Sequence, residues 1–138
     1  SFGIGSDSNL RISVAEELRL LEFGCRLRTH RRNVLASSGR SCGRTLYQGA
    51  ALGGAQALGQ PVGRIETGCR ADLVELDSRH PLLVGRCHDS VLDIWLFAGG
   101  SAMVRSVWVA GVQCVSEGRH KGRERIESSG RRAMQALL

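Results

Sequence analysis

The sequence predicts an α/β protein in which the end of one domain is joined to part of another. Three observations support this: an apolar run at residues 2–4, two helix-forming stretches that follow it, and a change to short β-type segments from Pro61 onward. One strand followed by two helices has no second strand with which to form a sheet. The opening part and the later β segments therefore do not predict one self-contained sheet.

The opening stretch, SFGIGSDSN, predicts a short strand from Phe2 to Ile4 that ends in a polar, glycine-containing tip with Asp7. A dinucleotide-binding loop is excluded, because Ser8 occupies the position where its fingerprint requires a third glycine. An aspartate beside glycine and serine is most often a turn or capping residue. The stretch by itself therefore does not assign a catalytic role to Asp7.

The next stretch, RISVAEELRLLEFGCRLRTHRRNVL, predicts a helix that begins just after Ser13. Ser13 and Glu16 have the spacing of a capping box. Apolar side chains at helical spacing predict the buried stripe: Val14, Leu18, Leu21 and Cys25. Acidic residues come early and basic residues late, the order that complements the helix dipole. The basic run at 26–32 is therefore explained as a solvated helix end.

A second helix is predicted from Thr45 to about Leu58, after a polar loop at 36–44. Thr45 and Gln48 have capping-box spacing, and Gly59–Gln60–Pro61 is a typical stop. The interior, GAALGGAQALG, consists mostly of small residues that lower helix propensity. We expect these residues to allow close packing against a neighbouring element.

Short β segments are predicted at 63–77 and 106–118, and Ala110–Gly111 is expected to form a hairpin turn. Between them, residues 89–100 predict a short helix capped by Asp89, with a strand as a close alternative. The tail after Arg119 predicts a mostly polar helix interrupted at Ser128–Ser129–Gly130.

Charge and cysteine spacing restrict the possible functions. The net charge is +6, but the arginines are scattered among acids and the run at 26–32 lacks interleaved aromatic residues, so a nucleic-acid-binding module is only an alternative. No apolar run approaches the roughly 20 residues of a membrane span. The cysteines at 25, 42, 69, 87 and 114 form no C-x-x-C pair and are expected to be free thiols. The four isolated histidines (30, 80, 88 and 120) favour structural or surface positions over metal binding.

Taken together, these segments resemble the metal-dependent amidohydrolase superfamily. GSDSN followed by ISVAEELRLLEFGCRLR resembles the eighth strand and following helix of its (β/α)8 barrel. PVGRIETGCRADLVELD and VRSVWVAGVQCVSEGRH resemble parts of its small β-sandwich. Within the superfamily, EELRLLE, RLRTHRRNVLA, LGGAQALGQPVGRI and DIWLFAGG are similar to the formimidoylglutamate deiminases of bacterial histidine degradation.

The resemblance implies a C-terminal fragment of a longer enzyme, inactive alone. Residues 1–59 would be the end of the barrel, with its last strand and helices, 60–120 a β-sandwich segment, and 121–138 a C-terminal helical tail. It also implies the site residues. Asp7 would be both a zinc ligand and the catalytic proton acceptor, at the strand end where such barrels place their active sites. Ser6, Ser8 and Asn9 would bind substrate or support Asp7, although turn formation explains each equally well.

The implied reaction is the hydrolysis of N-formimidoyl-L-glutamate to N-formyl-L-glutamate and ammonia, with one divalent metal ion, Zn²⁺, per site. The histidines that complete the family's metal site have no match here. Asp72, in the family's ADL motif, is interpreted as structural. The expected partners are the small-molecule substrate, the missing N-terminal barrel segment and a second copy in a cytoplasmic homodimer, with neither nucleic acid nor membrane. The alternative enzyme is another deaminase or chlorohydrolase of the superfamily, acting on a nucleobase or a related C–N substrate.

Overall fold

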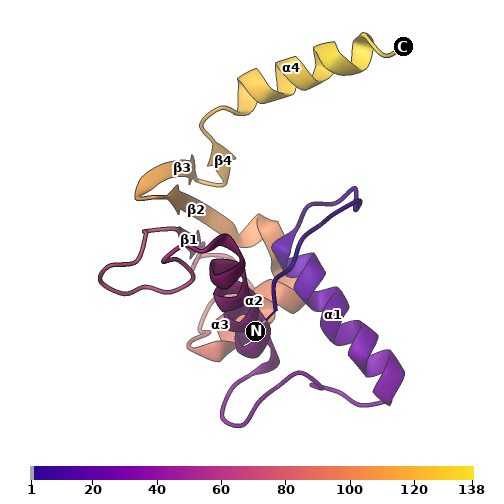
Figure 1. The fold of residues 1–138 in the computed structure, drawn as a ribbon, viewed down its shortest axis with the longest axis vertical. Helices are drawn as coiled ribbons and strands as arrows, with labels where there is room; N and C mark the ends of the chain where they lie inside the picture. Colours follow the sequence, from indigo (N-terminus) through magenta and orange to yellow (C-terminus); the bar gives the residue numbers. More distant parts are fainter. Residues whose placement is uncertain (1) are drawn as a thin grey trace.

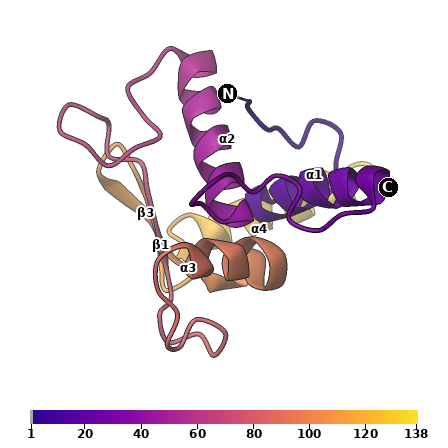
Figure 2. The same ribbon diagram turned by 90° about the horizontal axis from the view of Figure 1, so that it is seen from below.

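The computed structural model describes residues 2–138 and is a mixed helix and strand structure, which confirms the predicted α/β character at that level (Figure 1). In chain order, the elements are α1 (Val14–Thr29), α2 (Cys42–Leu58), β1 (Leu73–Leu76), α3 (Asp89–Ile94), the π-helical turn η1 (Trp95–Gly99), the 3₁₀ turn η2 (Gly100–Met103), β2 (Val104–Val109), β3 (Val112–Ser116), β4 (Arg119–His120) and α4 (Arg123–Gln135). Helices α1, α2 and α3 gather around one core and the sheet lies to one side (Figures 1 and 2), and α4 stands away from both (Figure 1).

The predicted strand at Phe2–Ile4 does not form within the described residues, where this segment pairs with no other strand; its place as a barrel strand stays a prediction. The segment lies against α2. A Cβ atom on Gly53 would overlap the Phe2 backbone, and one on Gly49 would lie 2.7 Å from the Phe2 ring. The expectation that the small residues of α2 allow close packing is confirmed.

Helix α1 begins where the sequence predicts, but its buried face differs from the prediction. The Ser13 hydroxyl accepts a hydrogen bond from the Glu16 backbone N–H at 3.3 Å, as expected of an N-cap. Val14 and Leu21 of the predicted stripe are 51% and 40% exposed. The buried residues of the helix are Ala15, Leu18 and Glu22. The buried face of α1 therefore differs from the predicted stripe, because the Glu22 carboxylate takes one of its positions.

Glu22 is fully buried and holds the loop between α1 and α2. Its carboxylate accepts hydrogen bonds from the Arg26 side chain at 2.7 Å and from the backbone N–H groups of Val34 and Leu35, both at 2.9 Å. The Arg26 guanidinium also lies over the Phe97 ring at 5.4 Å. Burial raises the pKa of Glu22, but the hydrogen bonds it accepts outweigh burial and the pKa is lowered. The carboxylate therefore stays charged inside the core.

Helix α2 begins at Cys42 with Ser41 as its N-cap, so the predicted start at Thr45 is wrong. The Ser41 hydroxyl accepts from the Arg44 backbone N–H at 3.2 Å. Two carboxylates of α3 fix this end of α2, because Asp89 accepts from the Ser41 N–H at 3.0 Å and Asp93 from the Gly43 N–H at 2.7 Å. The predicted stop is confirmed, since Gly59 caps the helix with a left-handed φ of 60°.

Residues 89–100 begin as a helix, so the alternative prediction of a strand is wrong. The prediction that Asp89 caps this helix is also wrong. His88 is the N-cap of α3, and Asp89 is the first helical residue, where its carboxylate holds α2. Further on, η1 and η2 bring Trp95, Leu96 and Met103 into the core. The core cluster joins residues of α1 and α2 to this later segment: Ala15, Leu18, Cys42, Leu46, Ala50, Leu83, Trp95, Leu96 and Met103.

Within residues 2–138 the strands form one antiparallel sheet in the order β1-β2-β3-β4. The predicted hairpin turn is confirmed, because Ala110 and Gly111 have φ values of 51° and 79°, as a two-residue turn of this kind requires. Asp72 accepts from the Ala110 N–H at 2.8 Å and so holds the hairpin to the segment before β1. Its structural interpretation is confirmed.

Helix α4 runs unbroken through Ser128–Gly130, so the predicted interruption is wrong. The Ser128 hydroxyl donates to the Arg125 carbonyl at 3.0 Å, which satisfies it inside the helix. The Arg123–Glu127 pair at 2.7 Å spans one turn. None of the residues of α4 is buried. In the part of the chain that the structure describes, neither this nor another helix is long and apolar enough to cross a membrane.

Candidate active site

The predicted site residues form one turn between the opening segment and α1. The Ser6 carbonyl accepts a hydrogen bond from the Asn9 N–H at 2.7 Å, which closes the turn. Asp7 has a left-handed φ of 43°, a conformation that aspartate tolerates better than most residues. Its side chain is exposed, as are those of Ser8 and Asn9, whereas Ser6 is half-buried. The turn therefore presents a carboxylate to its surroundings.

Two acids in the first turn of α1 contact the segment that follows Asp7, Glu17 by a hydrogen bond and Glu16 by an exposed ion pair. The Asn9 side-chain amide donates to the Glu17 carboxylate at 2.7 Å, and the Arg11 guanidinium lies 3.2 Å from the Glu16 carboxylate. The sequence interpretation missed Glu17 because it treated this acid only as a complement to the helix dipole. Its place in the first turn directly after the site loop is the signal that could have revealed it.

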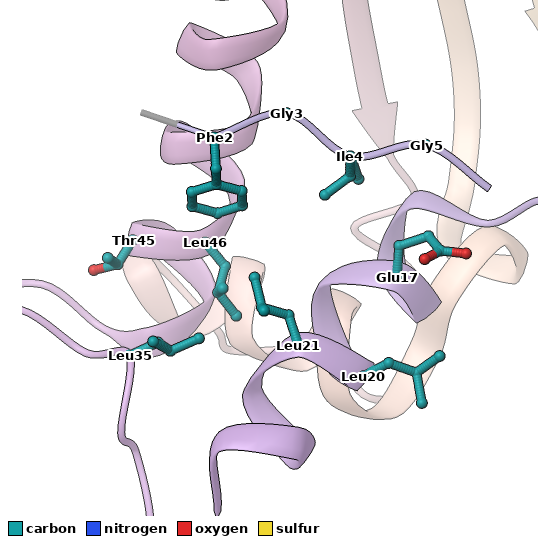
Figure 3. A pocket seen from close by; sticks show the side chains of 10 residues that line it. All are labelled: Phe2, Gly3, Ile4, Gly5, Glu17, Leu20, Leu21, Leu35, Thr45 and Leu46. Carbon is teal, nitrogen blue, oxygen red and sulfur yellow. The ribbon is translucent and has the colours of Figure 1, made fainter. Parts of the chain in front are cut away.

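An apolar hollow of about 690 Å³ lies beside this turn, between the opening segment, α1 and α2 (Figure 3). It is lined by Phe2, Gly3, Ile4, Gly5, Glu17, Leu20, Leu21, Leu35, Thr45 and Leu46. Leu21 and Leu46 point toward one another below the Phe2 ring, and Glu17 lies near Ile4 and Gly5 (Figure 3). Asp7 is not part of its lining. The hollow is therefore suited to apolar packing and is distinct from the Asp7 turn.

A metal ion needs more donors than the turn supplies. The Asp7 carboxylate is an oxygen ligand of a kind that zinc accepts. However, residues 2–138 contain no group of three or more His, Cys, Asp or Glu side chains placed to hold a metal ion. The histidines serve local structure, for example His120, whose ring accepts from the Gly122 N–H at 3.0 Å. The described donors thus fit one zinc ligand and do not make a complete site.

Two groups with shifted pKa values, Cys42 and Asp89, lie where α2 meets its neighbours. Burial, a hydrogen bond to Glu22 and the charge of Glu22 together raise the pKa of the Cys42 thiol to about 12. Such a thiol is protonated at neutral pH and is a poor nucleophile. The Arg44 side chain and the Ser41 N–H lower the pKa of Asp89, which holds α2. Both groups therefore serve the packing of α2.

Residues 1–114 match the amidohydrolase family, and the chain belongs to this family. A formimidoylglutamate deiminase of Pseudomonas aeruginosa is 54% identical over 124 residues. This match covers 89% of the present chain and 27% of that relative, so the chain spans about a quarter of its length. The resemblance to the formimidoylglutamate deiminases is therefore confirmed.

Two solved structures are also similar to the chain. The crystal structure of an amidohydrolase from Brucella melitensis is 45% identical with a TM-score of 0.88, and the match covers 100% of this chain and 30% of that one. An adenosine deaminase from Xanthomonas campestris, with bound zinc, is 26% identical with a TM-score of 0.77, over 96% and 29% of the two chains. Family and neighbours imply a TIM-barrel-type enzyme, of which residues 2–138 form helices and a small sheet.

Proposed function

We propose that the chain is part of an enzyme that hydrolyses N-formimidoyl-L-glutamate to N-formyl-L-glutamate and ammonia. The observation that carries this proposal is the 54% identity to a formimidoylglutamate deiminase over 124 residues. The proposed architecture assigns residues 1–59 to the end of the barrel, 60–120 to a β-sandwich segment and 121–138 to a helical tail. The 138-residue chain alone is then inactive, because the remaining barrel segment is needed to complete the site.

In this proposal Asp7 is the proton-transfer residue of the site. Water adds to the formimidoyl carbon, and the Asp7 carboxylate accepts a proton from it. That proton passes to the imino nitrogen and gives a tetrahedral intermediate with one hydroxyl and one amino group. Asp7 then accepts the hydroxyl proton and passes it to the amino nitrogen, so that the C–N bond to this nitrogen breaks, ammonia leaves and the carbon keeps the oxygen as a formyl carbonyl. The exposed carboxylate on a turn that ends the opening segment supports this role. Ser6 and Ser8 flank it as candidates for contacts with substrate.

We also propose zinc as the cofactor, with Asp7 as one ligand. A solved relative with a TM-score of 0.77 is described with bound zinc, which supports this choice. Since the described residues contain no group of three or more side chains placed to hold a metal ion, the other ligands would come from the remaining barrel segment. The complete enzyme is proposed to be a cytoplasmic homodimer.

A second candidate is a deaminase that acts on a nucleobase or nucleoside. The observation that favours it is the similarity to the adenosine deaminase from Xanthomonas campestris. Both candidates release ammonia by hydrolysis of a C–N bond, so they differ in substrate and not in reaction class. The lower identity, 26% against 54%, places this candidate second.

A chimaera tests the proposal: residues 1–138 replace the matched part of the Pseudomonas aeruginosa relative. We expect it to release ammonia from formimidoylglutamate and not from adenosine, guanine or cytosine. Asp7→Asn keeps the size of the side chain but removes its charge, and we expect turnover to fall about 10²–10⁴-fold, as when a general base is lost. Zinc content is measured in parallel.

The matched control is Asp77→Asn, which changes another turn aspartate located at the end of β1, where it accepts from Arg79 at 2.9 Å. It should leave turnover nearly unchanged. A folded chimaera that acts only on adenosine would replace the proposal with the second candidate. Normal turnover in Asp7→Asn would show that this carboxylate is only a turn residue.

A further inference from the structure

The turn that carries Asp7 has little packing of its own to restrain it. Asp7, Ser8 and Asn9 are exposed, and the left-handed φ of 43° at Asp7 carries some backbone strain. The hydrogen bond from the Asn9 N–H to the Ser6 carbonyl closes the turn but does not attach it to the body of the protein. Its position therefore depends on contacts with a neighbouring element.

Glu17 supplies such a contact from the first turn of α1. Its carboxylate accepts from the Asn9 side-chain amide at 2.7 Å. Glu17 is half-buried and also lines the apolar hollow, whose lining includes Ile4 and Gly5 from the other side of the turn (Figure 3). It therefore contacts the chain after Asp7 and faces the same hollow as the chain before it. Helix α1 is in turn fixed to the core through Leu18, which is fully buried.

The neighbouring ion pair is a weaker tether. Arg11 lies 3.2 Å from Glu16, but its side chain is 81% exposed. Exposed pairs of this kind contribute about 0–1 kcal/mol because solvent screens them and long side chains lose entropy. Glu16 is thus a matched control for Glu17, since both are glutamates in the same helical turn and both contact the site loop.

We propose that Glu17 is a positioning residue for Asp7, acting through the side chain of Asn9. This inference rests on the proposed function and extends it to a residue outside the turn. It also assigns Asn9 to support of the turn and not to contact with substrate, because its amide nitrogen is engaged by Glu17. A carboxylate that transfers protons must be held in place, and a displacement of about 1 Å can reduce turnover about 100-fold.

The test uses the chimaera with Glu17→Ala, Asn9→Ala and the double variant. We expect kcat to fall about 10- to 100-fold in each single variant with little change in KM, since the reacting carboxylate is displaced while substrate contacts remain. The double variant should be no worse than either single one, because both remove the same contact. Glu17→Gln keeps an oxygen acceptor for Asn9 and should retain near-normal kcat.

Glu16→Ala and the thermal midpoint of every variant separate positioning from general destabilisation. An unchanged kcat in Glu17→Ala, additive losses in the double variant, or an equal loss in Glu16→Ala would overturn the inference. If Asp7→Asn abolishes turnover while Glu17→Ala does not, the inference fails and the proposed function stands. If the parent chimaera does not act on formimidoylglutamate, or Asp7→Asn is fully active, both fail.

Discussion

Replacing Glu22 by alanine should release the loop between α1 and α2. Glu22 is fully buried, and the N–H groups of Val34 and Leu35 each donate to its carboxylate at 2.9 Å. Hydrogen bonds to a charged group contribute about 1.5–3 kcal/mol each. Losing both therefore costs at least about 3 kcal/mol of local stability, which corresponds to a roughly hundredfold increase in opening of the loop.

Hydrogen exchange of the chimaera, followed by mass spectrometry on peptides that cover residues 30–41, measures this opening directly. We expect exchange in Glu22→Ala to be about a hundredfold faster there, while peptides from the β2–β3 hairpin are unchanged. Glu75→Ala changes a half-buried glutamate of β1 that lies 3.6 Å from Arg105; it is the control and should leave the loop as it is. Equal exchange in parent and Glu22→Ala would refute the assignment of this carboxylate as the anchor of the loop.

Two further predictions concern acid and the packing of the opening segment. Because the pKa of Glu22 is lowered in the folded state, its stabilisation is present above its unfolded pKa of about 4.3 and is lost as pH falls through the folded value. Thermal midpoints measured from pH 7 to pH 3 should therefore fall less steeply in Glu22→Gln than in the parent, and parallel curves would contradict this. Gly53→Ala places a methyl group against the Phe2 backbone and should lower kcat by displacing the segment before Asp7, whereas Gly54→Ala, whose Cβ meets no other atom within 4 Å, should not.

Local rules predicted the features that depend on neighbouring residues. Ser13 caps α1, Gly59 ends α2, and Ala110–Gly111 forms the hairpin turn, because each depends on backbone conformation within a few residues. The turn at residues 6–9 also follows from local rules, since serine, aspartate and asparagine favour turns, and the four predicted site residues therefore lie in one turn. The contact that joins that turn to α1 was missed, because the spacing between Asn9 and Glu17 belongs to no standard motif; the position of Glu17 in the first helical turn after the loop was the only signal for it.

The incorrect or unconfirmed predictions involve partners distant in the sequence. Residues 2–4 favour an extended backbone, but a strand also requires a neighbour, and the described residues provide none. Helix α2 begins early because Asp89 and Asp93 bind its first N–H groups from about 50 residues away. Hydrophobic periodicity could not place Glu22 inside, because a glutamate is counted as polar unless its partners are known.

The attachment of the α1–α2 connection through Glu22 has a consequence for sequence change. Two consecutive N–H groups, at residues 34 and 35, bind one carboxylate, and the segments on both sides of them are largely exposed. Lengthening a loop costs little entropy as long as its fixed point is kept. Residues 30–33 and 36–40 can therefore accept insertions or an affinity tag, whereas a deletion that moves residues 34 and 35 away from Glu22 cannot be compensated nearby.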